Sequence, residues 1–461
     1  MKDLAVLILA AGKGTRMISR RAKVLHKVCG VPMVSLVCRA AAALQPGDVI
    51  VVVGQDGDLV RKSLKEYGAR FVDQAEQLGT GHAMITARAE FEGLAGNLLV
   101  LYGDTPRIKP DTLRMLVDRH RHSGAATTLL TTRVANPYGY GRIIRNGKGQ
   151  IAAIVEEKDA SPAQRSITEI NPGLYCFQIR PLVASLEGLS NRNVQGEYYL
   201  TDVIAIQREA GLQIEGVIHE DSEELQGINT RAELAEADRA LRMRKNRQLM
   251  AAGVTMIDPE STYVDLDVEL ERDVTLYPQV ILQGSTFIGE GATIHSGARI
   301  TDSRISAEAL ILNCSQIADS VVGAGSSVGP FARIRDRSVV GEGCRVGNFV
   351  ELKKTSLGDR SKAAHHAYLG DATIGCDVNI GAGVITCNYD GVRKHATIIE
   401  DGAFIGTDSQ LVAPVRIGRN AYVAAGSCIT ADVPEGALAI ARERQVVKAD
   451  WVKRRAKTES P

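Results

Sequence analysis

The stretch that decides the fold of the second half of the chain is VGAGSSVGPFARIRDRSVVGEGCRVGNFVEL, residues 322–352. An aliphatic residue returns in it at every sixth position, usually with a small or turn-forming residue behind it. Neither an α-helix, at about 3.6 residues per turn, nor a single strand, at about two, lines up residues with that spacing. Outside the quoted stretch, with a few shorter steps, the period includes Leu270, Leu276, Leu282, Ile288, Ile294, Ile300, Ile305, Ile311, Ile317, Leu369, Ile374, Ile380, Ile399, Ile405, Leu411, Ile417, Val423 and Ile429.

A period of six is typical of a parallel β-helix, in which each coil buries its aliphatic residue on those of the neighbouring coils. The run resembles the left-handed hexapeptide-repeat acyltransferases. A fold does not fix a function, so the repeat alone leaves open a structural, trimerising solenoid without chemistry.

Length and composition bound the remaining possibilities. With 461 residues, the chain exceeds the size of roughly 250–300 residues at which a single core stops growing, so at least two domains are expected. A net charge of +1 and an aromatic content of 4% argue against nucleic acid and anionic membranes as partners. The eight cysteines are scattered, as expected of reduced thiols in a cytoplasmic protein.

The N-terminal half has an α/β pattern. Leu4–Leu9 is a continuous apolar run, which predicts a buried parallel strand rather than a signal peptide, and a glycine loop follows it. Such a loop can approach a phosphate chain closely, although many glycine loops only turn the chain. The alternation of strand-like and helix-like segments predicts a mostly parallel sheet with ligands at the carboxyl ends of its strands. The expected strands are 49–53, 98–101 and 125–131, and the expected helices are 34–44, 81–92 and 111–120.

Several motifs of this half carry a specific resemblance. The order L-A-A-G-x-G-T-R-M, Q-L-G-T-G-H-A, Y-G-D-x-P, Y-G-R-I, E-x-K-D-A, E-I-N-x-G and Q-G-E-Y-Y-L-T-D is similar to that of the sugar-1-phosphate nucleotidyltransferases. From about residue 4 to about residue 442, the chain resembles the bifunctional N-acetylglucosamine-1-phosphate uridyltransferase / glucosamine-1-phosphate acetyltransferase family (GlmU-type).

This resemblance implies a uridyltransferase site for UTP and N-acetylglucosamine-1-phosphate. It implies that Arg16 and Lys23 neutralise phosphates and that Asp104 and Asn229 bind Mg²⁺, a hard cation that takes oxygen ligands. The other implied residues are Leu9, Ala10, Ala11, Gly12, Tyr102 and Gly103 around the nucleotide, Gln74, Gly79 and Thr80 at the uracil, and Gly141, Glu156 and Asn171 at the sugar.

Taken singly, several of these residues also have ordinary structural interpretations. Asp104 could cap a turn, and Arg16 and Lys23 could be solvated surface cations. Glu156 lies in a charged run that could simply face water. The order of the motifs along the chain favours roles in the uridyltransferase site over these structural interpretations. One departure is Ala22, where the family usually has proline before the lysine; it could loosen the loop that aims Lys23.

The join between the two halves is rich in Ala, Leu, Arg and Glu and lacks Gly and Pro from 230 to 252. This composition predicts one long exposed helix. We therefore expect a nucleotidyltransferase domain at 1–228, a linker helix at 229–252 and a left-handed β-helix domain at 253–461.

The period of six fails in two places, at 358–368 and at 386–395. Insertions into a repeat array are expected as surface loops, where binding groups usually lie. Acetyl transfer to an amine needs a base, and histidine titrates in the right range. The resemblance aligns His365 with the acetyltransferase base, while the residues alone leave His365 and His366 equally possible.

The resemblance also implies the rest of a second site and a homotrimer, with acetyl-CoA lying between neighbouring chains. The amino-sugar phosphate would contact Arg335, Lys353, Tyr368, Asn379 and Lys394, and acetyl-CoA would contact Ala382, Asn388, Tyr389, Thr407, Ala425 and Arg442.

These expectations combine into a cytoplasmic enzyme with two sites. The C-terminal domain would acetylate glucosamine-1-phosphate, and the N-terminal domain would join the product to UTP, giving UDP-N-acetylglucosamine for bacterial envelope polymers. Two alternatives remain open: a single-activity sugar-1-phosphate nucleotidyltransferase with a structural solenoid, and a scaffold or regulator without catalysis.

Overall fold

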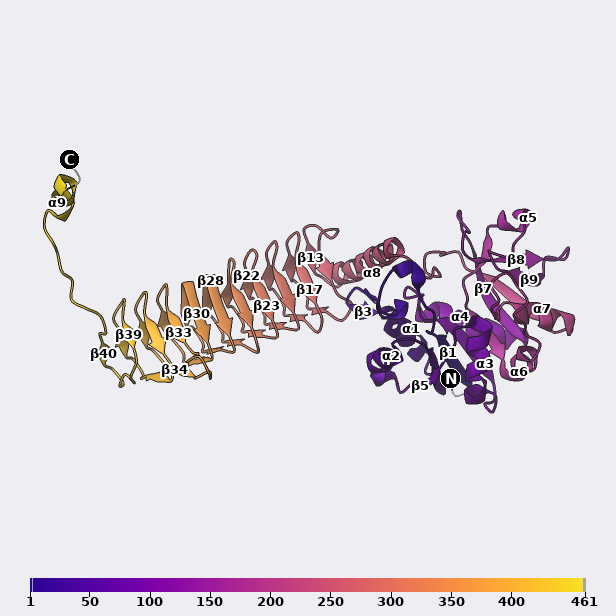
Figure 1. The fold of residues 1–461 in the computed structure, drawn as a ribbon, viewed down its shortest axis with the longest axis horizontal. Coiled ribbons are helices and arrows are strands. Elements are labelled where there is room, and N and C mark those ends of the chain that lie inside the picture. Colours follow the sequence, from indigo (N-terminus) through magenta and orange to yellow (C-terminus); the bar gives the residue numbers. More distant parts are fainter. Residues whose placement is uncertain (2, 459–461) are drawn as a thin grey trace. The chain divides into compact units, whose positions relative to one another are not determined.

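The computed structural model describes residue 1 and residues 3–458, and the chain divides into two compact units, Met1–Leu241 and Arg242–Pro461 (Figure 1). The division falls inside helix α8 (Arg231–Ala251), which matches the predicted helix at 230–252. The domain limits at 228 and 252 lie on either side of it and stay a prediction.

A mixed sheet runs through the N-terminal unit in the order β5-β4-β1-β6-β11-β7-β10-β8-β9, with β12 paired to β7. Strand β1 is buried along its whole length and pairs in parallel with β4 and β6. The carboxyl ends of these three strands therefore meet at one edge of the sheet, where ligands bind in such folds. The strands are β1 (Leu4–Leu9), β2 (Lys27–Val28), β3 (Val31–Pro32), β4 (Asp48–Val53), β5 (Arg70–Asp73), β6 (Asn97–Tyr102), β7 (Thr127–Arg133), β8 (Gly141–Arg145), β9 (Ile151–Val155), β10 (Glu169–Asn171), β11 (Tyr175–Gln178) and β12 (Ile214–Ile218).

Helices pack on this sheet and complete two apolar clusters that contain alternate residues of β1. Each of the three strands and three helices expected from the sequence is present, within a few residues. The helices of the chain are η1 (Thr15–Met17), η2 (Lys23–Leu25), α1 (Met33–Ala42), α2 (Gly57–Ser63), η3 (Lys65–Tyr67), α3 (Thr80–Phe91), α4 (Pro110–Ser123), α5 (Pro162–Arg165), α6 (Ile179–Leu186), α7 (Asp202–Glu209), α8 and α9 (Trp451–Thr458). None of the helices within the described residues is both long and apolar enough to cross a membrane.

His120 on α4 gives the N-terminal unit a pH-dependent stability. The ring is buried, with Nδ1 2.9 Å from Thr128 Oγ1 and Nε2 3.1 Å from Asn97 Oδ1. Burial lowers the pKa of His120 from 6.5 to about 4. The unfolded chain therefore takes up a proton at a higher pH than the folded chain, and stability must fall as the pH drops through that interval.

We expect the free energy for opening α4 to fall by about 2 kcal/mol between pH 7 and pH 5. Hydrogen exchange of the α4 amides measures this free energy. The variant His120→Gln should be less stable than the parent at pH 7, because it loses ring packing, and the difference should narrow at pH 5. An equal difference at both values would contradict the assignment.

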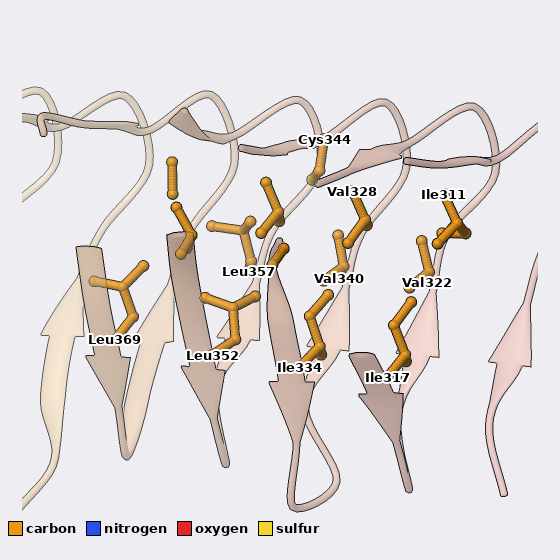
Figure 2. Packing of buried hydrophobic residues seen from close by; sticks show 14 of the residues in the cluster. Ile311, Ile317, Val322, Val328, Ile334, Val340, Cys344, Leu352, Leu357 and Leu369 are labelled. Atoms are coloured by element: carbon orange, nitrogen blue, oxygen red, sulfur yellow. The ribbon is translucent and has the colours of Figure 1, made fainter. Parts of the chain in front are cut away.

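The second unit is a parallel β-helix, as predicted. Each short strand pairs in parallel with the strand one coil further on, for example Val322 beside Val340 and Ile317 beside Ile334. The aliphatic residues of the period point inward and stack from coil to coil (Figure 2). No single coil could bury these side chains, so the solenoid depends on its neighbours for stability.

Two sheets form the sides of the solenoid. The first contains β13 (Thr255–Met256), β14 (Tyr263–Val264), β16 (Thr275–Leu276), β17 (Ile281–Gln283), β19 (Thr293–Ile294), β20 (Arg299–Thr301), β22 (Leu310–Ile311), β23 (Gln316–Ala318), β25 (Ser327–Val328), β26 (Arg333–Arg335), β28 (Arg345–Lys353), β30 (Lys362–Gly370), β32 (Asn379–Ile380), β33 (Ile385–Cys387), β35 (Phe404–Ile405), β36 (Gln410–Val412), β38 (Tyr422–Val423), β39 (Cys428–Ile429) and β40 (Leu438–Ala439). The second contains β15 (Glu269–Leu270), β18 (Phe287–Ile288), β21 (Arg304–Ile305), β24 (Val321–Val322), β27 (Val339–Val340), β29 (Ser356–Leu357), β31 (Ala372–Ile374), β34 (Thr397–Ile399) and β37 (Val415–Ile417).

The first expected insertion, at 358–368, is wrong. These residues continue the repeat, because Ala363 is fully buried in the position that an aliphatic residue holds in other coils. The small side chain hid the period, and the segment forms the long strand β30 rather than a surface loop. The second expected insertion is confirmed in part: Thr386 is buried at the repeat position, and the residues after it leave the coil as an exposed loop.

Candidate active sites

Four side chains meet at the carboxyl edge of the N-terminal sheet. Lys23 forms an ion pair with Asp104, and its Nζ donates to Asn229 Oδ1 at 3.0 Å. Arg16 Nη2 donates to the same oxygen, also at 3.0 Å. Sequence separations exceed 200 residues between Asn229 and both cations, yet the fold brings together all four residues predicted for phosphate and metal.

Local backbone contacts hold these groups in place. Gly103 N donates to Leu9 O at 2.9 Å, which joins the turn before Asp104 to the end of β1. Ile228 N donates to Asp104 O at 2.9 Å and sets the neighbouring Asn229 beside it. The first turn of α8 adds a capping arrangement, in which Glu233 Oε2 accepts from Thr230 N at 3.0 Å.

The loop after β1 shows which predicted nucleotide residues are accessible. Leu9, the last residue of β1, and Ala10 are both buried, and Ala10 N donates to Val52 O of β4 at 2.9 Å. Ala11 is half-buried and Gly12 is exposed. A Cβ added at Gly12 would meet nothing within 4 Å. The loop therefore presents open backbone beside the cations.

One of the predicted uracil residues, Gln74, lines a cleft of about 340 Å³ at the ends of β4 and β5. Gln74 is buried in its wall, and its Nε2 donates to Gly79 O at 3.3 Å. Gly79 has a φ of 104°, and a Cβ there would lie 2.5 Å from Tyr198 O, so only glycine fits. Gln77 also lines the cleft, although no role was predicted for it.

Tyr102 connects the uracil side to the sugar side. Burial, followed by the nearby Glu156 carboxylate, raises its pKa, while a hydrogen bond with Thr80 acts in the opposite direction. Thr80 Oγ1 also accepts from Leu200 N at 3.1 Å. Tyr102, Thr80 and Glu156 are therefore neighbours, as the prediction requires.

Among the sugar-side residues, Gly141 and Asn171 are buried and Glu156 is half-buried. Thr201 Oγ1 donates to Glu156 Oε1 at 3.0 Å, and burial raises the pKa of Glu156. A Cβ added at Gly141 would lie 3.6 Å from the Glu156 carboxylate oxygens. Asn171 Nδ2 donates to Tyr175 Oη at 2.6 Å. The interpretation of Glu156 as part of a solvated charge run is wrong, because its carboxylate faces inward.

The donor set fits a hard cation that takes most of its ligands from its substrate. Asp104 offers a carboxylate and Asn229 an amide oxygen, both on Lys23. Among residue 1 and residues 3–458, no group of three or more His, Cys, Asp and Glu side chains is placed to hold a metal. Mg²⁺ is commonly bound by one or two protein oxygens together with phosphate oxygens, so this sparse set is compatible with it.

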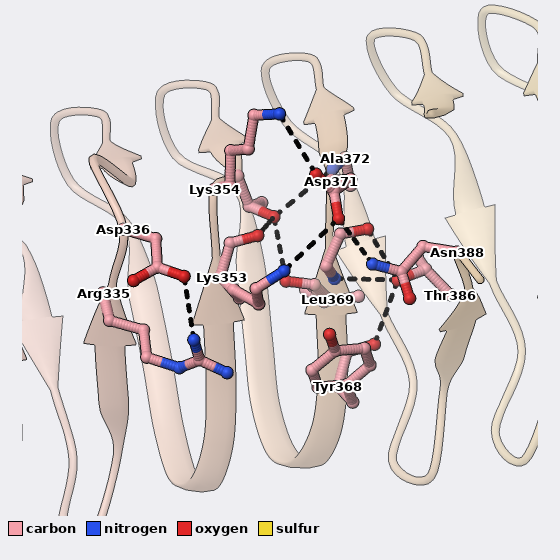
Figure 3. A network of polar contacts seen from close by, with 12 residues as sticks. Arg335, Asp336, Lys353, Lys354, Tyr368, Leu369, Asp371, Ala372, Thr386 and Asn388 are labelled. Carbon is pink, nitrogen blue, oxygen red and sulfur yellow. Dashed lines mark hydrogen bonds and ion pairs between the residues drawn. The ribbon is translucent and has the colours of Figure 1, made fainter. Parts of the chain in front are cut away.

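A second polar cluster lies on the solenoid, across β26, β28, β30 and the exposed loop (Figure 3). Asp371 accepts from Asn388 Nδ2 at 2.6 Å and pairs with Lys353 at 3.6 Å and Lys354 at 3.4 Å. Burial would raise the pKa of Asp371, but the Asn388 amide and the two ammonium groups hold it below its ordinary value. One carboxylate thus sits among several cations.

The remaining cations of this cluster come from neighbouring coils. Arg335 pairs in register with Lys353 and donates to Glu351 Oε1 at 2.7 Å. Lys394 from the exposed loop lies against Lys353, and this contact lowers the pKa of Lys394. Tyr368 is beside Glu351 in the adjoining strand. The predicted phosphate-binding residues therefore converge, with an excess of positive charge.

Asn379 and Asn388 do not lie beside the neighbours that the resemblance implies for them. Asn379 is in register with Lys362, at the start of β30, rather than beside Tyr368. Asn388, assigned by resemblance to acetyl-CoA, contacts Asp371 in the cation cluster. Tyr389 is exposed on the loop, and its hydroxyl donates to Gly391 O at 2.6 Å.

The two candidate bases differ in their partners. His365 is exposed on β30, and its Nδ1 lies 3.0 Å from Asn348 Oδ1 on β28. Because the amide oxygen accepts, Nδ1 carries the proton and Nε2 keeps a free lone pair. His366 is also exposed and has a φ of 34°. The hydrogen bond to Asn348 sets His365 apart.

A row of turns begins at the two exposed histidines and runs along the solenoid. The bonds that join successive turns are Gly383 N to His366 O (2.7 Å), Asp408 N to Ala382 O (2.7 Å) and Gly426 N to Thr407 O (2.8 Å). A Cβ at Gly426 would lie 3.8 Å from Arg442 Cδ. Ala382, Thr407, Ala425 and Arg442 therefore follow one another in line from His365.

Some residues of both sites could not be assigned from the sequence. Asn348, Glu351 and Asp371 contact predicted residues, but each lies one coil or more away along the chain. Thr201 belongs to the quoted Q-G-E-Y-Y-L-T-D motif, which was the available signal for its contact with Glu156. The others carried no motif that would have marked them.

Comparisons with known proteins agree with this arrangement. Three family models match: a MobA-like NTP transferase domain at residues 6–193, a GMPPB C-terminal domain at 262–354 and a bacterial transferase hexapeptide of six repeats at 396–431. The three models cover both halves of the chain.

Curated relatives match over nearly the whole chain, and each is named "Bifunctional protein GlmU". The protein of Trichlorobacter lovleyi is 46% identical, covering 97% of this chain and 97% of its own. That of Pelobacter propionicus is 47% identical, covering 98% of both. That of Shouchella clausii is 49% identical, covering 98% of this chain and 100% of its own.

These matches confirm the predicted pair of transferase domains and favour two activities over a single-activity enzyme with a structural solenoid. The chain therefore belongs to the family of the bifunctional protein GlmU, enzymes that join a nucleotidyltransferase domain to a hexapeptide-repeat acyltransferase domain.

Proposed function

We propose that the solenoid acetylates glucosamine-1-phosphate with acetyl-CoA and that the N-terminal unit then transfers UMP from UTP to the product, releasing pyrophosphate. The observation that carries this proposal is the presence of two separate cation clusters in one chain, around Lys23 and around Lys353, each beside groups suited to one of the reactions. The product would be UDP-N-acetylglucosamine, a precursor of bacterial envelope polymers.

In the first site, Lys23 and Arg16 neutralise the phosphates as the sugar phosphate attacks the α-phosphorus of UTP. Their shared contact with Asn229 Oδ1, at 3.0 Å each, aims both cations at one point. Such groups lower the barrier when they are fixed before charge develops. Mg²⁺, held by Asp104 and Asn229, would neutralise further charge on the phosphate oxygens.

Selectivity in this site comes from the two flanks of Tyr102. Gln74, with its amide already oriented by Gly79 O, is placed to read the edge of a uracil. On the other flank, Glu156 and Asn171 offer a carboxylate and an amide to sugar hydroxyls and the N-acetyl group. Buried polar groups of this kind penalise a ligand that leaves them unpaired.

In the second site, His365 Nε2 takes a proton from the amine as its nitrogen attacks the thioester carbonyl carbon. The C–N bond forms, the C–S bond breaks, and the CoA thiolate leaves with the electron pair. Asn348 holds the tautomer that leaves Nε2 free to accept. Lys353, Lys394 and Arg335 would bind the phosphate of the amino sugar.

We further propose that acetyl-CoA lies along the row of turns from His365 to Arg442. Thr407, Ala425 and Arg442 of this row are exposed, and in a homotrimer a neighbouring chain would enclose the ligand there. We propose a cytoplasmic location, in keeping with free thiols at Cys314 and Cys428 on the surface.

One experiment tests both activities and the metal. The purified chain should release pyrophosphate from UTP with N-acetylglucosamine-1-phosphate, and thiol from acetyl-CoA with glucosamine-1-phosphate. A chelator should reduce pyrophosphate release by at least about 10²-fold and leave thiol release unchanged, because only the first site has a metal role. Thiol release that needs the metal, or pyrophosphate release that does not, would contradict the proposal.

A further inference from the structure

The turn that carries Lys23 is anchored from a distant loop. Ala22 precedes η2, and its backbone N–H donates to Asp56 Oδ2 at 2.8 Å. Leu25 N donates to Ala22 O at 3.0 Å, so the same residue closes the turn that contains Lys23. The carboxylate of Asp56 therefore bonds the backbone immediately before the phosphate-binding lysine.

This use of Asp56 is not the usual one for its position. Asp56 is the N-cap of α2, where an aspartate commonly accepts from the first turn of its own helix. Here its side chain makes no such bond, and its φ is 64°. The adjoining Gly54 and Gln55 line the cleft assigned to uracil. Asp56 thus joins the wall of that cleft to the turn of Lys23.

A second contact leaves the turn little freedom once this bond is made. A Cβ at Gly14 would lie 2.6 Å from Lys23 Cβ, so the glycine loop passes directly against the lysine stem. With Ala22 fixed on one side and Gly14 on the other, the ammonium group is directed at Asp104 and Asn229. Loss of either constraint would let the stem turn away.

We propose that Asp56 is a positioning residue of the uridyltransferase site, which aims Lys23 by holding the N–H of Ala22. This inference rests on the proposed role of Lys23 at the phosphates. Ala22 has φ −53° and ψ 138°, values that proline also adopts. Proline has no N–H, so a chain with proline here would fix the same backbone without Asp56. In this chain the hydrogen bond takes the place of the ring.

A double-mutant cycle tests the proposal. We expect Asp56→Ala to lower kcat/KM for UTP about tenfold, the scale of a hydrogen bond to a charged acceptor. Ala22→Pro alone should change it less than about twofold, because the native φ suits proline. In the Ala22→Pro background, Asp56→Ala should have no further effect. A full tenfold loss in that background would overturn the proposal, as would no loss in the parent.

A second test of the proposal does not need the proline variant. Asp56→Asn keeps an oxygen acceptor, so it should retain activity within about threefold of the parent. Equal losses in Asp56→Asn and Asp56→Ala would assign the effect to charge and overturn the proposal. Thiol release by the solenoid reports the concentration of intact chain in every variant, and hydrogen exchange of the α4 amides reports the folding of the N-terminal unit.

Failure of the proposed function would look different. If Lys23→Ala left pyrophosphate release intact, the role of Lys23 would be wrong, whatever Asp56 does. If Lys23→Ala abolished release and Asp56→Ala did not change kcat/KM, only the positioning role would be wrong.

Discussion

Replacing Lys23 with alanine should lower the rate of UMP transfer by about 10²–10³-fold, the range seen when one fixed group that stabilises transition-state charge is removed. The change removes the ammonium that contacts both Asp104 and Asn229. The pairing carboxylate then remains without its cation, which also weakens the approach of an anionic nucleotide. Pyrophosphate release at saturating UTP measures the effect on the chemical step.

The matched control is Lys27→Ala. Lys27 is exposed on β2, four residues further along the same segment, so the substitution removes an equal charge outside the cluster. UMP transfer should stay within about twofold of the parent in this variant. Thiol release should be unchanged in both. A similar loss in the two variants would show that general charge, and not the aimed ammonium, supports the reaction.

Replacing His365 with alanine should lower acetyl transfer by about 10²–10⁴-fold, as expected for the loss of a general base. UMP transfer should continue at the parent rate, because the two sites lie in different compact units. Thiol release from acetyl-CoA in the presence of glucosamine-1-phosphate is the measurement.

The neighbouring histidine supplies the control. His366→Ala removes an imidazole from the next position, which is also exposed but does not contact Asn348. We expect it to retain activity within a few-fold. Asn348→Ala should fall between the two, by about tenfold, since His365 would keep its lone pair and lose its orientation. A larger loss in His366→Ala than in His365→Ala would assign the base to His366.

The architecture of both units could be predicted because it depends on short-range patterns. The six-residue period is repeated many times, and a buried parallel strand such as β1 is apolar throughout. The period was hidden at Ala363 and Thr386, which replace a larger aliphatic residue, and it is interrupted by the exposed loop that follows Thr386. Alanine and threonine are also common on protein surfaces, so a hydrophobic pattern cannot show that either residue is buried.

The sites were predictable only as far as motifs reached. Arg16 and Asp104 could be placed in one site because each lies in a quoted motif, and the family resemblance assigned Lys23 to the same site. The contacts of Asn348 with His365 and of Asp56 with Ala22 join residues that are well separated in sequence and belong to no shared motif. Such contacts depend on how coils and loops meet in space, which no local spacing records.

The row of turns from His365 to Arg442 fixes the distance between these two residues. Successive coils of a parallel β-helix are separated by about 4.8 Å, the spacing of hydrogen-bonded strands, so the number of coils sets the distance between the base and the far cation. Removing one whole coil between them would move Arg442 closer by that increment and leave the chemistry at His365 untouched. Under the proposed placement of acetyl-CoA, the number of coils between His365 and Arg442 sets the span that the acyl donor has to cover.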